Sequence, residues 1–289
     1  MDKIPVSVLV PVKNEIANLR DCLRSVEFAD EVVVVDSASS DGTIAAAEAA
    51  GARVVQFPWD GKFPRKKNWA LEHVPWRHEW VLIVDADERI PPELAREIGE
   101  AIQRPGFDGF FLNRRFWFLG GWIGHCGYFP SWNLRLFRHR LGRYEKVEMP
   151  AGDHSAGDNE VHEHVLLDGR SDYLRAPMDH YAFPTYAIWI EKHNRYSDWE
   201  ATVAHDLHED RGVDTLADGP LGSPLERKRW LKRVARRLPG RPWLRFLYHY
   251  ILKQGFRDGW RGWVLCRSLA WYEWVGQVKA RERKRPSGG

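Results

Sequence analysis

The amino-acid sequence predicts an α/β protein with a doubly wound, mainly parallel sheet and an α-helical, basic and Trp-rich C-terminal extension. Over about the first hundred residues, short continuous apolar runs alternate with segments whose apolar residues recur at helical spacing. Repeated βα units of this length predict parallel strands with helices on both faces. Beyond residue 225 the composition changes, because Trp and basic residues accumulate in helical patterns.

These patterns define the elements expected in the N-terminal part of the chain. Strands are predicted at 6–12, 32–35, 53–57 and 80–84, where apolar residues follow one another as in strands buried on both faces. Helices are predicted at 16–26, 43–50, 65–74 and 94–102 from their apolar periodicity. Gly51 closes the second of these helices, a position that favours glycine.

From about residue 105 the regular alternation stops. Short strand-like pieces at 109–113 and 133–138 lie in a stretch rich in Gly, aromatic residues and Arg. A mobile loop is expected at 145–159, a strand at 161–167 and a helix at 185–203. We therefore divide the chain into a βα half (1–105), a second half of the same domain (106–213), a Gly/Pro/Asp-rich linker (214–224) and a helical module (225–289).

Composition excludes several classes of protein. The 289 residues are 44% hydrophobic and 29% charged, as expected for a folded chain, and the net charge of +3 is too small to indicate nucleic-acid binding. Cys22, Cys126 and Cys266 are odd in number and far apart in the sequence, with no CxxC spacing, which argues against a disulfide framework or a structural zinc site and suits a reducing compartment. Pro11 and Lys13 interrupt the early apolar run, so we expect no signal peptide and a cytoplasmic protein.

Acidic and amide side chains follow three of the predicted strands. Asn14 and Glu15 come after the first strand, Asp36 directly after the second, and Asp85 and Asp87 after the fourth. Open α/β sheets bind ligands at this carboxyl edge. Two carboxylates one residue apart at a strand end are typical ligands of Mg²⁺ or Mn²⁺, which bridges the diphosphate of a nucleotide; a solvated acidic turn is the alternative. A carboxylate at the tip of the second strand could accept hydrogen bonds from a nucleobase or ribose.

Four segments carry a resemblance to a known family. The segments PVKNE (11–15), VVVVDSASSDGT (32–43), KKN (66–68) and VLIVDADE (81–88), in this order and spacing, resemble the family 2 glycosyltransferases of the GT-A fold. The resemblance covers residues 5–103. The later pieces LRLF, VHE and HY are most similar to bacterial enzymes of lipopolysaccharide-core and exopolysaccharide assembly. The QxxRW motif of processive members is missing, which argues against polymer synthesis.

The resemblance implies a GT-A-like (Rossmann-like) fold and a role for each matching residue. It implies that residues 1–105 bind a nucleotide sugar, most simply of the UDP type, and that 106–213 bind a saccharide or lipid-linked acceptor. It implies an inverting, metal-dependent hexosyltransferase that uses Mg²⁺ or Mn²⁺. By this resemblance, the nucleotide pocket is lined by Pro11, Asn14 and Glu15, and the base is recognised by Asp36. The nucleotide is also approached by Lys66, Lys67 or Asn68. Asp85 contacts the ribose or the metal-bound diphosphate, and Asp87 is a ligand of the metal.

Five further residues complete the predicted site. An inverting transfer needs a general base to deprotonate the acceptor hydroxyl, and Glu163 is the first candidate because it stands alone on one face of its expected strand. Asp153 and Asp158 in the neighbouring loop are the alternatives. His180 could complete the metal shell, contact a phosphate or be structural. Arg135 could neutralise a diphosphate or pair with a carboxylate.

The C-terminal module has two distinctive segments. Residues 226–241 hold eight basic residues and one acidic residue on a helix with one apolar face, which is typical of helices on anionic membrane surfaces. Trp260, Trp263, Trp271 and Trp274 form a second stripe. The alternative is a helical cap on the catalytic domain; we expect the Trp stripe mainly in the core and the basic face outward.

Competing functions differ in what they require. A sugar nucleotidyltransferase would need a Gly-rich phosphate loop after the first strand, and residues 11–15 contain no Gly. A non-catalytic carbohydrate-binding relative would not need Asp36, Asp85, Asp87 and Glu163 together. A glycosyltransferase that acts on a soluble natural product or peptide remains an alternative to one that acts in cell-envelope assembly.

Overall fold

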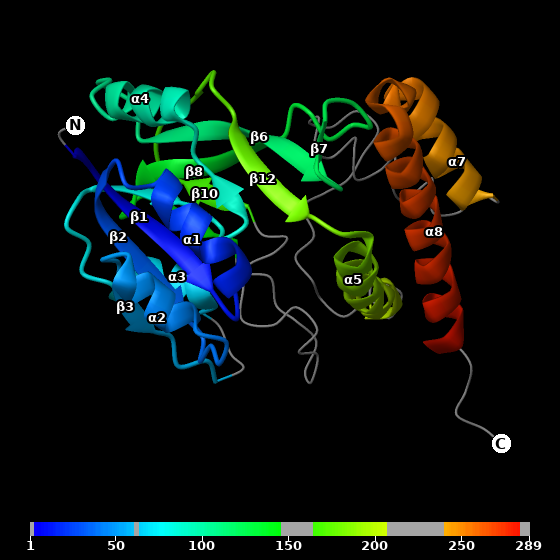
Figure 1. Ribbon diagram of the computed structural model, residues 1–289, viewed down its shortest axis with the longest axis horizontal. Helices are drawn as coiled ribbons and strands as arrows, with labels where there is room; N and C mark the ends of the chain where they lie inside the picture. Colours follow the sequence, from blue (N-terminus) through cyan, green and yellow to red (C-terminus); the bar gives the residue numbers. More distant parts are fainter. Residues whose placement is uncertain (1–2, 61–63, 146–163, 207–239, 284–289) are drawn as a thin grey trace. The chain divides into compact units, whose positions relative to one another are not determined.

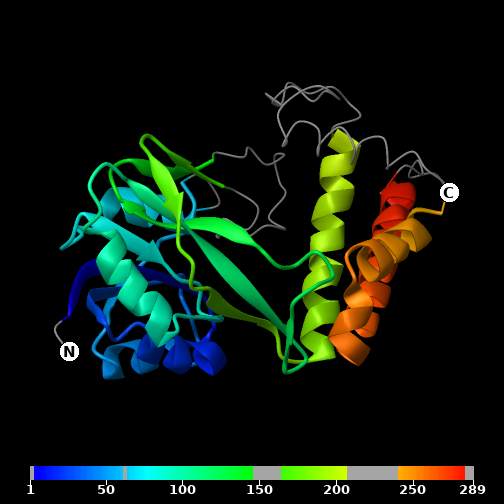
Figure 2. The same cartoon turned by 90° about the horizontal axis from the view of Figure 1, so that it is seen from above.

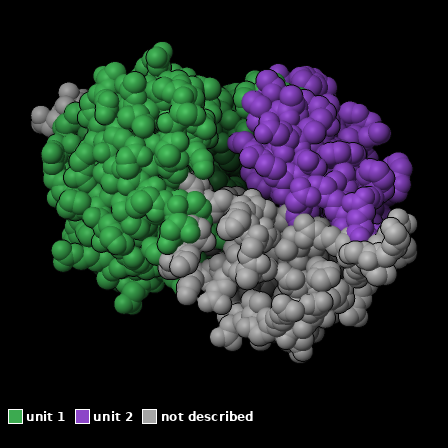
Figure 3. Space-filling view, turned by 90° about the horizontal axis from the view of Figure 1, so that it is seen from below, with its two compact units in different colours: residues 1–124, 128–147, 156–184 green, residues 125–127, 148–155, 185–289 purple. Residues whose placement is uncertain are grey.

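The computed structural model describes residues 3–60, 64–145, 164–206 and 240–283, with backbone alone for 199–206 and 283. The chain divides into two compact units, which Figure 3 colours separately. Unit 1 comprises residues 1–124, 128–147 and 156–184, and unit 2 comprises 125–127, 148–155 and 185–289. We describe each unit by itself.

The first four long strands of unit 1 form a parallel sheet in the order β3-β2-β1-β4. These strands are β1 (Ile4–Val12), β2 (Ala29–Asp36), β3 (Arg53–Gln56) and β4 (Trp80–Ile83). Every residue of β1 from Val6 onward is buried, as a continuous apolar run predicts. The doubly wound, mainly parallel sheet expected from the sequence is confirmed.

Helices cover both faces of this sheet (Figure 1). The helices are α1 (Ile16–Ser25), α2 (Thr43–Ala49), α3 (Lys66–His73) and α4 (Pro92–Ala101). The even-numbered valines of β1 pack with buried residues of α1, α2 and α4 in one core cluster. Leu9 and alternate residues of β2 and β4 pack with α3 in a second cluster on the other face. Strand alternation thus divides the apolar residues between two cores.

The second half of unit 1 extends this sheet with both antiparallel and parallel strands. The added strands are β5 (Glu88–Arg89), β6 (Gly109–Phe118), β7 (Gly121–Ile123), β8 (Trp132–Arg138), β9 (Gly142–Tyr144), β10 (Val165–Leu167), β11 (Ser171–Tyr173) and β12 (Met178–Phe183). The sheet continues in the order β4-β8-β6-β12-β5, so the short strand β5 lies at its far end. The expected strand 161–167 is described from residue 164 on, and most of the expected loop 145–159 lies outside the described residues.

Unit 2 is helical in its described part. It contains α5 (Tyr186–Asp206), α7 (Arg241–Leu247), the π-helix η1 (Tyr248–Leu252), the 3-10 helix η2 (Gly255–Asp258) and α8 (Gly259–Arg283). Helices α5 and α8 lie side by side, and α7 packs on α8 (Figure 2). Trp189 of α5 is fully buried and stacks on His193 at 3.8 Å between ring centroids. The linker 214–224 and residues 226–239 of the basic helix lie outside the described residues.

One expectation for the C-terminal module is wrong. The Trp residues of α8 point outward: Trp260, Trp263, Trp271 and Trp274 are 57%, 43%, 38% and 53% exposed. The buried face of α8 consists of the smaller or less amphipathic residues Leu265, Cys266, Leu269 and Tyr272. Both faces of this helix are apolar. The sequence periodicity therefore predicts the two apolar stripes but does not indicate which of them is buried. In the described part of the chain, none of the helices combines the length and apolarity that crossing a bilayer requires.

Candidate active site

The loops that follow β1 and β2 are bound to each other by side chains at the carboxyl edge of the sheet. Asn14 adopts a left-handed backbone (φ 55°), a conformation that Asn tolerates better than most residues. Its backbone N–H donates to Ser39 Oγ at 2.8 Å, and its side-chain oxygen accepts from Ser40 N at 2.8 Å. Glu15 donates its backbone N–H to Thr43 Oγ1 at 2.9 Å. Both loops are therefore held in one conformation.

Asp36 lies at the tip of β2 and is fully buried. Its carboxylate accepts hydrogen bonds from the hydroxyl and from the backbone N–H of Ser39, the latter at 3.0 Å. Pro11, also predicted for the nucleotide pocket, is buried in β1 opposite Val35. In this conformation Asp36 shapes the loop after β2, and contact with a nucleobase requires the Ser39 side chain to move.

The three consecutive residues at the start of α3 are all buried. Lys66 Nζ donates to the carbonyl of Val12 at 2.6 Å, which attaches the start of α3 to the end of β1. The Asn68 side chain bonds both the N–H and the carbonyl of Tyr144, at 2.8 and 3.0 Å. Lys67 points to the end of β4, where its Nζ lies 2.9 Å from Asp85 Oδ1. Of the three, Lys67 reaches the carboxylate cluster.

Asp85 lies between two cations. Arg135 of β8 donates to Asp85 Oδ2 at 2.7 Å, opposite the contact with Lys67. Burial alone would raise the pKa of Asp85, but Arg135 and Lys67 outweigh it and hold that pKa well below 3.8. Asp85 is thus ionised over the whole physiological range. Because both of its oxygens already contact cations, the structure favours Asp85 as an organiser of Lys67 and Arg135.

Glu88 is a central member of the cluster that the sequence analysis did not assign a role. It is fully buried in β5 and accepts from Arg135 at 3.0 Å and from the backbone N–H of Asp85 at 2.8 Å. Arg114 of β6 lies 3.4 Å from the same carboxylate. The acidic run DADE (85–88) could have indicated this role of Glu88. A third carboxylate so close to the other two needs buried cations nearby.

Asp87 and His180 come together at the junction of β5 and β12. His180 pairs with Glu88 in the β12–β5 ladder, and the N–H of Tyr181 donates to the carbonyl of Asp87 at 2.8 Å. This register places His180 Nε2 at 3.5 Å from Asp87 Oδ2. The two side chains are 20% and 18% exposed, so solvent and ligands reach them. The structure therefore joins two predicted metal ligands that lie far apart in the sequence.

This pair fits a divalent cation that shares its shell with a phosphorylated ligand. A carboxylate oxygen and an imidazole nitrogen are suitable donors for Mn²⁺, and Mg²⁺ sites often use one or two carboxylates plus substrate phosphates. Within the described residues, no group of three or more His, Cys, Asp or Glu side chains forms a complete metal shell. Of the described residues, Asp87 and His180 would hold the cation, together with substrate phosphates or water.

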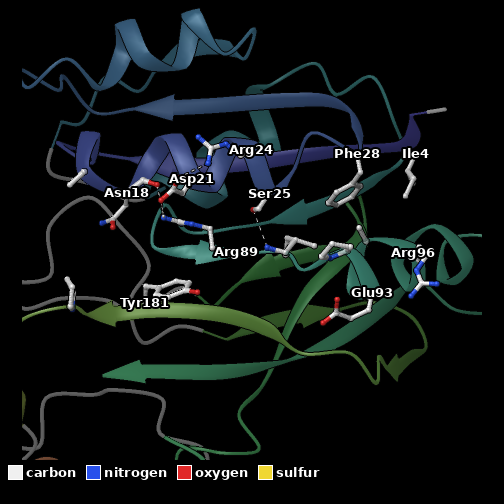
Figure 4. Close-up of a pocket in the computed structure, with 15 residues that line it drawn as sticks. Ile4, Asn18, Asp21, Arg24, Ser25, Phe28, Arg89, Glu93, Arg96 and Tyr181 are labelled. Carbon is white, nitrogen blue, oxygen red and sulfur yellow. Dashed lines mark hydrogen bonds and ion pairs between the residues drawn. The ribbon is translucent and has the colours of Figure 1, made fainter. Parts of the chain in front are cut away.

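A separate pocket of about 1250 Å³ lies beside this region (Figure 4). Asn18, Asp21 and Arg24 of α1 form one wall, and Arg89 and Tyr181 extend the pocket toward β5 and β12. Arg89 also donates to the carbonyl of Asn18 at 2.9 Å. Of the described residues predicted for donor or metal binding, none lines this pocket.

The candidate general bases lie outside the described residues. Glu163, Asp153 and Asp158 all fall in the segment 146–163. Their assignment stays a prediction from the sequence. His164, the first residue after that segment, donates its backbone N–H to Glu145 Oε2 at 3.2 Å.

The comparisons with known proteins agree on one family. The family model described as "Glycosyl transferase family 2" matches residues 7–166. A lipopolysaccharide core biosynthesis glycosyltransferase, LpsC of Rhizobium meliloti (strain 1021), is 31% identical over 211 residues, which cover 69% of this chain and 71% of the relative. An uncharacterized glycosyltransferase of Rickettsia bellii (strain RML369-C) is 40% identical over 94 residues, which is 32% of this chain and 31% of that protein.

Among solved structures, one resembles almost the whole chain. The mannosyltransferase PcManGT from Pyrobaculum calidifontis, in complex with GDP-Man and Mn²⁺, superposes with a TM-score of 0.52. The alignment covers 98% of this chain and 88% of that one at 18% identity. At this identity the likeness establishes the fold alone.

Proposed function

The chain belongs to glycosyl transferase family 2, and on that premise we propose that it is an inverting hexosyltransferase of cell-envelope assembly. Its donor is a nucleotide sugar, of the UDP type in our proposal. Its acceptor is a saccharide or lipid-linked saccharide of the lipopolysaccharide core, a choice supported by the 31% identical relative. We also propose that it acts in the cytoplasm; the odd number of cysteines, with no CxxC spacing, supports this location.

The observation that carries this proposal is the Asp87–His180 pair beside the buried ion cluster. In a GT-A-like sheet the donor diphosphate lies at the carboxyl edge, where these side chains are accessible. Asp87 and His180 would hold Mg²⁺ or Mn²⁺ there. When bound, such a cation neutralises the charge that develops on the leaving nucleoside diphosphate.

Asp85 and its cations position the groups around the donor. Lys67 and Arg135 are both almost completely buried, so neither side chain can swing away from Asp85 at low cost. The ionised Asp85 in turn fixes the two positive charges at the end of β4. Together with Arg114, these cations balance the negative charges of Asp85, Asp87 and Glu88, so the acidic run carries no net negative charge that would repel a polyanionic ligand.

The acceptor hydroxyl must lose a proton as it attacks the anomeric carbon. We propose Glu163 as the base, with Asp153 and Asp158 as the alternatives named above. The described strand β10 begins at Val165, two residues after Glu163, and pairs with β9. Tyr144 of β9 is in turn bonded to Asn68 of α3, which connects this strand pair to the donor side of the sheet.

Replacing Asp87 tests the metal assignment. Asp87→Asn should lower the rate of sugar transfer by on the order of 10²–10³-fold, because one ligand of the charge-neutralising cation is lost. The same variant should lose Mn²⁺-dependent binding of UDP, measured by calorimetry. Asp21→Asn is the matched control: Asp21 lies on α1 in the separate pocket with 62% of its side chain exposed, and its replacement should leave both measurements unchanged. Near wild-type, Mn²⁺-dependent transfer by Asp87→Asn would refute the assignment.

Replacing Glu163 tests the base. Glu163→Gln should keep donor affinity and reduce kcat by about 10²–10⁴-fold, since the amide cannot accept the proton. Steady-state kinetics with saturating donor, alongside UDP binding, separates these effects. An unchanged kcat would transfer the role to Asp153 or Asp158, each tested by its own Asn variant.

A further inference from the structure

Helix α8 carries an exposed aromatic stripe. Residues at positions 260, 263, 267, 271 and 274 fall on one side of the helix, because their spacings of three and four follow its 3.6-residue period. Four of them are Trp, between 38% and 57% exposed, and the fifth is the exposed Arg267. The outward side of a helix in a soluble protein is usually polar. This stripe has the opposite composition.

The preceding element carries a second exposed stripe. None of the side chains of α7 and η1 is buried. Apolar residues recur there in adjacent pairs every four positions, all between 45% and 72% exposed: Trp243, Leu244, Leu247, Tyr248, Ile251 and Leu252. Phe246 and Tyr250 of this element each contact the ring of Trp263 at 5.4 Å between centroids, which links the two stripes. An apolar surface of this extent marks an interaction site.

Cations are interleaved with the exposed rings. Lys253 lies 5.5 Å from the ring of Tyr248, Arg261 lies 4.8 Å from that of Trp260, and Arg267 lies 5.4 Å from that of Trp263. Residues 241–274 contain six Lys or Arg and two acidic residues. Both acidic residues are engaged within the unit: Asp258 bonds His125, and Glu273 pairs with Arg241 and Arg245. The outward surface is therefore aromatic and positively charged.

We propose that α7, η1 and α8 form a binding surface for an anionic lipid bilayer. Trp and Tyr favour the boundary between headgroups and acyl chains, and Lys and Arg beside them attract anionic headgroups. A second copy of the chain fits less well, because a symmetric contact would bring two positive surfaces together. The apolar side chains would enter the bilayer to a shallow depth while the helices lie parallel to its plane. This inference concerns lipid binding and does not depend on the sugar-transfer activity.

Co-sedimentation of the full chain with vesicles tests the proposal. We expect the chain to bind phosphatidylcholine vesicles that contain phosphatidylglycerol and to bind vesicles of phosphatidylcholine alone more weakly. This difference between anionic and neutral vesicles should disappear as the salt concentration rises. Lipids brominated in the acyl chains should quench part of the Trp emission, because the exposed Trp rings reach the upper acyl region.

Two sets of variants separate the aromatic and charged contributions. Trp260→Ser with Trp274→Ser should weaken binding by about 10²-fold and reduce the bromine quenching. The matched control is Trp122→Ser with Trp132→Ser, which removes two rings of unit 1 that are 47% and 39% exposed.

The charge variant replaces three exposed cations of unit 2 with Gln, at Lys253, Arg257 and Arg267. Binding at low salt should fall on the order of 10²-fold. Its control makes the same change in net charge at exposed positions of unit 1: Arg20, Arg96 and Arg175. Circular dichroism confirms that each variant is folded.

Three results would overturn the proposal. The first is no binding of the wild-type chain to anionic vesicles. The second is equal loss of binding in the unit 1 controls, which would mean that the surface has no special role. The third is a dimer in solution that the Trp260→Ser, Trp274→Ser variant converts to monomer with no change in vesicle binding, which would assign the surface to a second copy.

Discussion

The two units treat buried titratable groups in opposite ways. At the carboxyl edge of unit 1, Asp85 and Arg135 are both charged: the pKa of Asp85 is held well below its usual range, and that of Arg135 is raised by Asp85 and Glu88 despite burial. In unit 2, burial lowers the pKa of His193 to about 4 and also lowers that of His249, so both imidazoles are neutral at pH 7. The carboxyl edge of unit 1 keeps buried charge, whereas these two buried histidines of unit 2 are neutral.

One local motif occurs in both units and isolates the effect of burial. In α3, His73 bonds the carbonyl of Trp69 at 2.9 Å and stacks on its ring at 5.0 Å. In α5, His193 makes the same bond to Trp189 at 2.9 Å and stacks at 3.8 Å. His73 is exposed and His193 is 8% exposed. The spacing and the bond are the same, so solvent access distinguishes the two histidines.

Breaking the charged cluster should have the largest effect on stability. Arg135→Met should destabilise unit 1 by about 3–5 kcal/mol, because it leaves the buried Glu88 and Asp85 without their shared cation. Urea unfolding followed by circular dichroism measures this change. Arg138→Met is the control, since Arg138 is 27% exposed and pairs with the partly exposed Asp108 and Glu79; we expect about 1 kcal/mol or less.

If Arg135→Met and Arg138→Met had equal effects, buried charge would not explain the stability of unit 1. Arg135→Lys sharpens the comparison further. It keeps the charge, but the shorter Lys side chain does not place its ammonium where Nη2 of Arg135 bonds both Asp85 and Glu88, so the stability of this variant should fall between those of Arg135→Met and the wild type.

Burial of the neutral His193 should make the stability of unit 2 depend on pH, with a smaller effect than that of the charged cluster. The unfolded chain binds a proton at His193 near pH 6.5 and the folded chain only near pH 4. The free energy of unfolding that the neutral His193 contributes is therefore fully present above pH 6.5. It is lost as the pH falls toward 4, and the loss is about 2 kcal/mol after allowance for partial water access. Urea unfolding of the wild type and of His193→Phe at pH 7.5 and 4.5 measures the difference, which the Phe variant should reduce.

The same two measurements would contradict the role of burial if the pH dependence of stability were equal in the wild type and in His193→Phe.

The sequence was most informative where one physical signal dominated. Continuous apolar runs located β1, β2 and β4, because strands buried on both faces leave no room for polar residues. The strands β6, β8 and β12, which form the mixed part of the sheet, gave weaker signals, since their order depends on contacts between distant segments. The direction of the Trp stripe on α8 was predicted wrongly because both faces of that helix are apolar.

The candidate site shows the same limit. The order of strands placed Asp36, Asp85 and Asp87 at one edge, and the structure joins Asp87 to His180 across β5 and β12. The sequence does not reveal that Lys66 and Asn68 bond backbone groups, or that Glu88 accepts from Arg135. Such pairings depend on three-dimensional register, which composition and periodicity do not encode.

The strand order of unit 1 has a consequence for synthesis on the ribosome. Strand β1 is made first and pairs with β2 soon afterward, but its other neighbour is β4, where Ser7 pairs with Val81. At about 5–20 residues per second, the free edge of this mostly apolar strand waits about 4–15 s for its partner. During that interval the nascent chain presents an unpaired hydrophobic edge, the kind of surface that aggregates or recruits a chaperone. Slowing translation between β2 and β4 should therefore lower the yield of folded enzyme more than slowing it after β8.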